Sequence, residues 1–198
     1  MQKKSLDQKD IVVDCAFSRA DATLDNPDFP CPQEILMQLV VLDILHWSTD
    51  ARLHMGQLIV NERIAEDVQV IFTALEQAHF LIESIIPIPV FGWNDIKSIA
   101  DNNTSGFNYR YIEGTRRLSW HAFGLAIDIN PFWNPVTLVP EGECQGSMYN
   151  PSRPGTLTKN SLPVRLFKER GFVWGGDWQC PRDFQHFEKH FSVLGQHL

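Results

Sequence analysis

A histidine and an aspartate seven residues apart, His121 and Asp128, are the first residues whose types and spacing suggest chemistry. Gly124 between them allows the chain to turn, and Leu125 to Ile129 alternates like a strand with Asp128 on its polar face. An isolated carboxylate on a buried strand is costly unless it is paired or bound to a metal. Nitrogen and oxygen ligands of this kind suit zinc, so we expect a metal site that needs a third ligand.

The third ligand is expected near the C-terminus, where His186 follows Asp183 in a segment rich in glycine and tryptophan. His121, Asp128 and His186 would then form a catalytic zinc site with a fourth position open for water. Asp183 is a spare carboxylate suited to act as a general base. The alternative is an ordinary histidine–aspartate hydrogen bond, and the presence of both motifs in one chain argues against it.

These motifs resemble the D-alanyl-D-alanine carboxypeptidase family of zinc metallopeptidases, which includes VanX- and VanY-type enzymes and phage L-alanyl-D-glutamate endopeptidases. The combined patterns are SxHxxGxAxD at residues 119–128, WGGDW at residues 174–178 and DxxHFE at residues 183–188. The similarity extends from about Leu39 to Phe191. It implies an α+β fold of the hedgehog/DD-peptidase type, with a small antiparallel sheet and helices packed on one side.

The resemblance also implies roles for single residues. Asp183 matches the family's acid/base carboxylate, where glutamate is often found, and Glu188 is the fallback for that role. Arg110 matches an arginine that meets substrate beside the zinc and stabilises an oxyanion or grips a carboxylate, with Arg116 and Arg117 as nearby rivals. The residues expected to contact substrate or orient a ligand are Ser119, Tyr109 and Trp174.

The implied function is zinc-dependent hydrolysis of peptidoglycan stem peptides by a carboxypeptidase or an endopeptidase. Asn102–Asn103 and the run from Asp128 to Pro131 look more like the VanY and endopeptidase branch than the VanX dipeptidases. We therefore expect little activity on free D-Ala-D-Ala. The alternative is a catalytically inactive, zinc-bearing binding module of the same fold, and Asp183 argues against it because such a module needs no base.

Composition limits the class of protein further. The chain of 198 residues is 43% hydrophobic and 21% charged, which suits one globular core. Its net charge of −7 argues against a nucleic-acid partner, and no apolar run is long enough to span a bilayer. We expect an N-terminal extension at 1–33 and one zinc peptidase domain at 34–198, acting as a monomer. We expect action at the cell wall or periplasm, although the N-terminus does not read as a signal peptide.

The elements that must position the site begin with two apolar runs, Leu39–Trp47 and Gln57–Val60, which a polar segment joins into a hairpin. Asn61 is expected to cap a helix whose core-facing residues are Ile64, Val68, Ile71, Phe72 and Leu75. Further strands are expected at Leu81–Ile86, Phe172–Trp174 and Phe187–Phe191, and further helices at Asn94–Ala100 and Ser161–Arg170. Glu141–Asn160 is expected to be a surface loop beside the site.

We predict structural roles for the four cysteines and for the histidines outside the metal site. The four cysteines lack CxxC spacing and allow three disulfide pairings: Cys15, Cys31, Cys144 and Cys180. One or two bridges would form if the chain works outside the cytosol, and four free thiols are the alternative inside it. We expect at least one bridge. The other histidines have no matching carboxylate in the sequence pattern and are predicted to be surface or structural residues: His46, His54, His79, His190 and His197.

Overall fold

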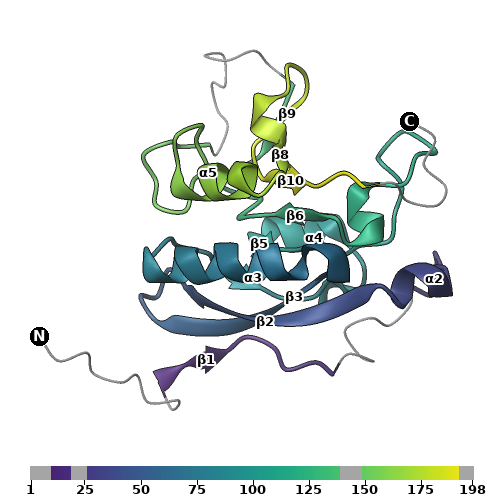
Figure 1. Ribbon diagram of the computed structural model, residues 1–198, viewed down its shortest axis with the longest axis horizontal. Coiled ribbons are helices and arrows are strands. Elements are labelled where there is room, and N and C mark those ends of the chain that lie inside the picture. The colour runs from purple at the N-terminus through teal and green to yellow at the C-terminus, as the bar shows by residue number, and fades with distance from the viewer. Residues whose placement is uncertain (1–9, 19–25, 139–148, 192–198) are drawn as a thin grey trace, which may run out of the picture.

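The computed structural model describes residues 10–18, 26–138 and 149–191 (Figure 1). The strands are β1 (Val12–Val13), β2 (Leu39–Trp47), β3 (Leu53–Asn61), β4 (Ser84–Ile85), β5 (Asn103–Thr104), β6 (Ala126–Asp128), β7 (Val136–Thr137), β8 (Val173–Trp174), β9 (Arg182–Asp183) and β10 (His186–Glu188). The helices are α2 (Gln33–Leu36), α3 (Glu62–Gln77), α4 (Asp95–Ala100) and α5 (Leu162–Glu169), with 3-10 turns η2 (Ile88–Phe91), η3 (Trp120–Phe123) and η4 (Gly175–Asp177). The α+β class is therefore confirmed.

The strands form several small sheets rather than the single antiparallel sheet that was predicted. Two sheets have three strands, in the orders β1-β3-β2 and β6-β10-β8, and two pairs are β4-β5 and β7-β9. The β1–β3 and β4–β5 pairs are parallel. Apart from β2 and β3, each strand has only two or three residues, which offers too few hydrogen-bonding positions to extend one continuous ladder.

The predicted hairpin of β2 and β3 is confirmed and is the longest paired segment described. Its antiparallel register runs from Leu39 opposite Asn61 to Trp47 opposite Leu53, so β3 begins earlier than the predicted Gln57. The tight connection is closed by a backbone hydrogen bond from the Ser48 N–H to the Arg52 carbonyl. This register fixes which side chains of the two strands face each other.

Helix α3 begins at the predicted cap. The Asn61 side chain accepts a hydrogen bond from the Arg63 N–H, and the predicted core-facing stripe is buried throughout. Figure 1 shows α3 between the β2–β3 hairpin and α5, and both contacts are close. The helices thus do not all pack on one side of one sheet, because α3 itself separates the hairpin from the C-terminal part of the fold.

The C-terminal helix and strands lie near their predicted positions, but the strands are shorter than predicted. Helix α5 ends before Gly171, which has a left-handed φ of 82°, and β8 follows at once. The predicted strand Leu81–Ile86 is regular only at β4, and the predicted strand Phe187–Phe191 is replaced by β10. Residues 149–160 contain no helix or strand, whereas the start of the predicted surface loop lies outside the described residues.

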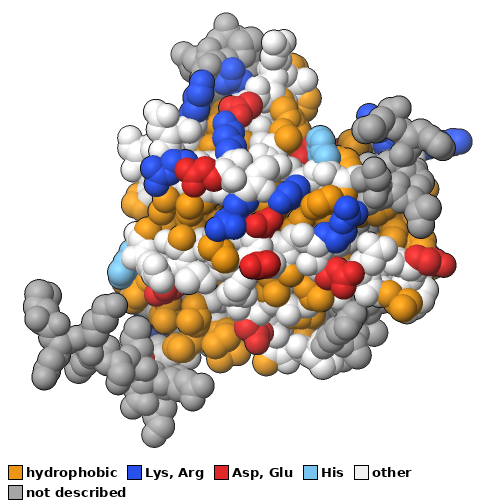
Figure 2. All heavy atoms as spheres, viewed as in Figure 1, with side chains coloured by type: hydrophobic (Ala, Val, Ile, Leu, Met, Phe, Trp, Pro, Cys, Tyr) orange, Lys and Arg blue, Asp and Glu red, His pale blue; other side chains and the backbone are white. Residues whose placement is uncertain are grey.

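Charged side chains tie these layers together at the surface. Asp67 on α3 pairs with Arg170 at 3.1 Å and with Lys189 at 2.7 Å, which joins α3 to the end of α5 and to the segment after β10. Figure 2 shows basic and acidic side chains interspersed across this face. None of the described helices is long and apolar enough to cross a membrane.

The cysteines are not bridged where the structure describes them. Cys15, Cys31 and Cys180 form no disulfide, so the expectation of a bridge is wrong for these three residues. Burial raises the pKa of the Cys15 thiol to about 11, which keeps it protonated at neutral pH. Cys144 lies outside the described residues.

Candidate metal centre

His121 is positioned by the short turn η3. Ser119 precedes this turn, and its hydroxyl accepts a hydrogen bond from the His121 N–H at 3.3 Å. Gly124 ends it with a left-handed φ of 66°, as predicted for a turn at this point. A Cβ at Gly124 would lie 2.7 Å from both the Asn61 nitrogen and a Leu39 methyl carbon, so only glycine allows the turn to approach the hairpin.

Asp128 and His186 meet across two neighbouring strands. They are directly opposite in the antiparallel β6–β10 pair, and His186 Nδ1 lies 2.9 Å from Asp128 Oδ1. His121 Nε2 completes the triangle, 3.1 Å from Asp128 Oδ2 and 3.2 Å from His186 Nδ1. All three residues are buried. The three residues predicted as ligands therefore converge, and we call them the first cluster.

Each histidine of the first cluster has its second ring nitrogen occupied by an outer partner. His121 Nδ1 lies 2.6 Å from the Gly106 carbonyl oxygen, and His186 Nε2 lies 2.9 Å from Glu188 Oε2. The outer acceptors orient the two rings so that the other nitrogens face Asp128. Metal-binding histidines have this arrangement, because the outer hydrogen bond fixes both the tautomer and the ring orientation.

The charges of the first cluster are strongly coupled. Burial alone would raise the pKa of Asp128, but His121 and His186 hold it well below its ordinary value. Burial alone would lower the pKa of His186, but hydrogen bonds to Asp128 and Glu188 raise it to about 10. In the metal-free protein, a proton on His186 therefore balances the buried carboxylate.

The donor set of the first cluster fits a zinc ion. Its three ligand atoms, two imidazole nitrogens and one carboxylate oxygen, all lie within 4.8 Å of one another. Tetrahedral ligands placed at zinc–nitrogen and zinc–oxygen bond lengths lie roughly 3.3 Å apart. The observed separations of 2.9 to 3.2 Å approach this value, so a metal would fit between these atoms with little movement of the side chains.

Asp183 lies beside the first cluster in the short strand β9. Burial and the neighbouring charge of Asp128 raise its pKa to about 6, against the opposing effect of His186 and His121. Its Oδ1 atom is buried without a hydrogen-bond partner. A Cβ at Gly175 would lie 2.6 Å from the Asp183 carbonyl oxygen, so a glycine is needed for β9 to approach this closely. A carboxylate with these properties is suited to exchange protons near neutral pH.

Arg110 makes its contacts away from the ligand atoms. Its guanidinium forms an ion pair with Asp95 of α4 and hydrogen-bonds the Tyr111 carbonyl oxygen at 3.3 Å. Its backbone carbonyl accepts a hydrogen bond from the Ser119 N–H, which places the backbone of Arg110 next to the η3 turn. The predicted contact of Arg110 with substrate remains a prediction.

The two aromatic candidates for the substrate site are buried in the core. Tyr109 stacks on Phe29 with ring centroids 5.0 Å apart. The Trp174 indole N–H donates to the Phe184 carbonyl at 2.9 Å, and Trp174 pairs with Phe187 across β8 and β10. These contacts support the walls of the site. Any contact of Tyr109 or Trp174 with substrate also remains a prediction.

Aromatic rings and a further histidine near the first cluster make contacts that the sequence did not predict. Trp178 lies over His186 with ring centroids 5.5 Å apart, and Trp120 stacks on His190 at 4.7 Å. His190 Nε2 lies 2.7 Å from Glu188 Oε1, so the prediction that His190 lacks a carboxylate partner is wrong. The spacing of His186, Glu188 and His190 two residues apart was the available signal, since such residues share a face in an extended segment.

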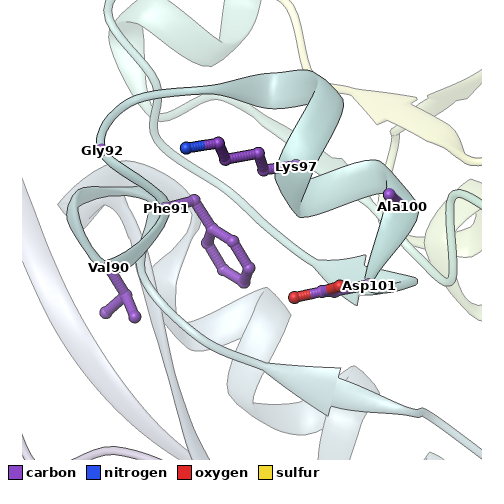
Figure 3. Close-up of a pocket in the computed structure, with 6 residues that line it drawn as sticks. All are labelled: Val90, Phe91, Gly92, Lys97, Ala100 and Asp101. Atoms are coloured by element: carbon purple, nitrogen blue, oxygen red, sulfur yellow. The ribbon is translucent and has the colours of Figure 1, made fainter.

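A hollow elsewhere on the surface carries none of these groups. It lies between η2 and α4, has a volume of about 360 Å³, and is lined by Val90, Phe91, Gly92, Lys97, Ala100 and Asp101. Figure 3 shows the Phe91 ring and the Lys97 and Asp101 side chains around this hollow. It contains no histidine and therefore does not compete with the first cluster as a candidate metal centre.

Comparison with known protein families agrees with the location of the first cluster. A family model described as D-alanyl-D-alanine carboxypeptidase matches residues 113–189, which include Asp183 and all three residues of the first cluster. No curated protein and no solved structure gives a significant match to the chain. The predicted resemblance is confirmed over this segment, which excludes Arg110, and the match supports a hydrolase of the peptidase class.

Proposed function

We propose that this protein is a zinc-dependent peptidase of the hedgehog/DD-peptidase fold that hydrolyses peptidoglycan stem peptides. The observation that carries the proposal is the convergence of His121, Asp128 and His186 within 4.8 Å in the segment that matches the carboxypeptidase family. Asp183, with a pKa of about 6 beside this cluster, supports a catalytic site over an inactive binding module. Such a substrate implies action at the cell wall or periplasm.

The first cluster would hold the zinc through His121 Nε2, His186 Nδ1 and one oxygen of Asp128. When bound, the metal would supply Lewis acidity and lower the pKa of a water molecule to around 7. Gly106 and Glu188 keep the two rings in position through their outer hydrogen bonds. The buried carboxylate of Asp128 supplies the negative charge that favours a cation over the empty cluster.

Asp183 would carry the proton in the reaction. A base with a pKa of about 6 is ionised at neutral pH, accepts a proton from the attacking water, and remains acidic enough to deliver it to the leaving amine. Its carboxylate has an unpartnered buried oxygen, Oδ1, which is free to accept such a proton.

The surroundings of Arg110 favour cleavage within the stem peptide. A carboxypeptidase must bind the free carboxylate at the end of its substrate, which requires a cation beyond the scissile bond. Arg110 already pairs with Asp95, whose other oxygen accepts a hydrogen bond from Asn108 at 2.6 Å. This compensated guanidinium is better suited to contact a peptide carbonyl than to capture a second carboxylate, so we propose endopeptidase activity ahead of carboxypeptidase activity.

The decisive experiment is mass spectrometry of purified peptidoglycan digested by the zinc-loaded protein, with the Asp183→Asn variant as the matched control. We expect new stem-peptide fragments with the wild-type protein and almost none with the variant. A pentapeptide stem and free D-Ala-D-Ala are tested alongside. Release of D-Ala alone would select the carboxypeptidase, and faster turnover of the dipeptide would overturn the proposed substrate. Zinc binding without any cleavage would select the inactive binding module.

A further inference from the structure

A second group of histidine and aspartate side chains lies in the N-terminal part of the chain, on the β1-β3-β2 sheet. His46 and His54 face each other across the β2–β3 hairpin, and Asp14 directly follows β1, whose Val12 pairs with His54. Asp14 Oδ1 lies 2.7 Å from His54 Nδ1, and Asp14 Oδ2 lies 3.4 Å from His46 Nε2. We call Asp14, His46 and His54 the second cluster.

Both rings of the second cluster are oriented by outer partners. His54 Nε2 lies 3.1 Å from Asp50 Oδ1, and His46 Nδ1 lies 3.5 Å from the Ile44 carbonyl oxygen. The opposite nitrogens, His54 Nδ1 and His46 Nε2, both face Asp14. An outer acceptor on each ring and a shared carboxylate between the inner nitrogens is the arrangement that also defines the first cluster.

Two polar atoms of the second cluster lack a hydrogen-bond partner among the described residues. His46 is 1% exposed, and both its Nε2 atom and the facing Asp14 Oδ2 atom are buried without a hydrogen-bond partner. If His46 Nδ1 carries the ring proton toward Ile44, the facing Nε2 and Oδ2 atoms are both acceptors. Two buried acceptors aimed at each other are unfavourable unless a proton or a metal cation lies between them.

We propose that Asp14, His46 and His54 form a second metal site that takes zinc or a similar transition-metal ion. The ligand atoms of these three residues lie within 4.8 Å of one another, and two imidazoles with one carboxylate match the ligand preferences of zinc. Asp14 and His54 keep 10% and 12% of their side chains exposed, which leaves a path for the ion to enter.

The second site is structural, because it joins the N-terminal segment to both strands of the hairpin at one point. Residues 10–18 reach the hairpin through the two-residue strand β1 and through a backbone hydrogen bond from the Asp14 N–H to the Met55 carbonyl at 2.9 Å. Phe17 adds two hydrogen bonds with the Gln57 side chain, at 2.7 and 3.2 Å. A metal bound by Asp14 and both strands of the hairpin fastens this N-terminal segment to the sheet. Such an ion stabilises the folded state by binding it in preference to the unfolded chain.

The test is zinc stoichiometry of the full-length protein, measured by metal analysis after dialysis against zinc and removal of the excess ion. We expect about two zinc ions per chain for the wild type and about one for His54→Gln and for Asp14→Asn. Both altered residues are partly exposed, so these variants keep the core intact. Glu83→Gln is the matched control, since Glu83 bonds Thr49 nearby without belonging to the second cluster, and it should retain both ions.

Limited proteolysis supplies an independent readout of the same site. Zinc should slow cleavage near residues 10–18 at least several-fold in the wild type and in the first-cluster variant His121→Ala, but not in His54→Gln. A zinc content unchanged by both His54→Gln and Asp14→Asn would overturn the second site, whatever the fate of the first. Loss of one zinc in His54→Gln alone, with none lost in His121→Ala, would support the second site and sink the proposed catalytic one.

Discussion

The two clusters use the same donor set in different surroundings. Each contains two histidines and one aspartate, and in each a pair of these residues faces across an antiparallel strand pair: Asp128 with His186 on β6–β10, and His46 with His54 on β2–β3. Both clusters complete the triangle with a residue from a neighbouring turn or strand end. The geometry of ligand atoms alone thus does not distinguish a catalytic site from a structural one.

The difference lies in the carboxylates around the ligands. Among the described carboxylates with a shifted pKa, Asp183 is the one whose pKa is raised, and it lies beside the first cluster. The carboxylate beside the second cluster is Asp50, which bonds a ligand ring as Glu188 does at the first cluster. It is exposed, and its pKa is lowered, chiefly by the hydrogen bond from the Arg52 N–H. A base suited to transfer protons at neutral pH is therefore present at only one of the clusters.

The largest effect is expected from removing a ligand of the first cluster. His121→Ala should lose the zinc of that cluster and hydrolyse stem peptides at least about four orders of magnitude more slowly, since both the metal and its activated water are lost. Zinc analysis and fragment release check this together. The control is His79→Asn, because His79 stacks on Trp47 outside both clusters and asparagine tolerates its φ of 55°. Full zinc content and activity in His121→Ala would contradict the assignment.

Removal of the base should separate metal binding from catalysis. Asp183→Asn should retain the zinc of both clusters while its hydrolysis rate falls roughly 10²- to 10⁴-fold, the usual contribution of general acid–base catalysis. Single-turnover hydrolysis of a stem peptide measures the loss. An active Asp183→Asn variant together with an inactive, zinc-loaded Glu188→Gln variant would transfer the role to Glu188.

The sequence predicted the first cluster and its supporting elements because their signals are local. The apolar runs of the hairpin, the cap at Asn61 and the turn at Gly124 each follow from neighbouring residues. The ligand triangle needed only one long-range assumption, that His186 lies beside Asp128. The residue types around His186 in the C-terminal segment supplied that assumption, and the register of β6 and β10 bears it out.

The second cluster was missed because its signal depends on register. His46 and His54 meet only because the hairpin connection fixes which residues are opposite, and the predicted β3 began after His54. Asp14 lies in the segment that was predicted to be an N-terminal extension. A strand of two residues, such as β1, is too short to give a recognisable hydrophobic periodicity. The division into small sheets was missed for the same reason, since pairs such as β4–β5 depend on tertiary contacts rather than on propensity.

Weaker effects are expected from the outer carboxylates, which orient ligands without binding the ion. Glu188→Gln should weaken zinc binding at the first cluster about 10- to 100-fold, and Asp50→Asn should do the same at the second. The Asp50 effect should lie at the lower end because its side chain is 45% exposed. Competition with a chromogenic chelator measures each affinity in a protein whose other cluster is disabled. A change at the wrong cluster would show that the two sites are coupled.

A graded effect is expected in the dependence of zinc affinity on pH. The folded-state pKa of His186 is about 10, above the ordinary value near 6.5, so its proton stabilises the metal-free fold below about pH 6.5 and this contribution is lost as the pH rises through 10. Zinc must displace that proton, and affinity at the first cluster should rise about tenfold per pH unit between roughly pH 7 and 9.

The zinc affinity of the second cluster should respond differently to a rise in pH. Burial lowers the pKa of His46 to about 4, against the opposing charge of Asp14, so this ring has no proton to release at neutral pH. Hydrogen bonds to Asp14 and Asp50 raise the pKa of His54 despite its partial burial, so His54 alone releases a proton there. Calorimetric titration with zinc in the His54→Gln and His121→Ala backgrounds isolates each cluster. The affinity of the second cluster should level off at a lower pH than that of the first, and identical pH profiles would show that the shared proton on His186 does not oppose the metal.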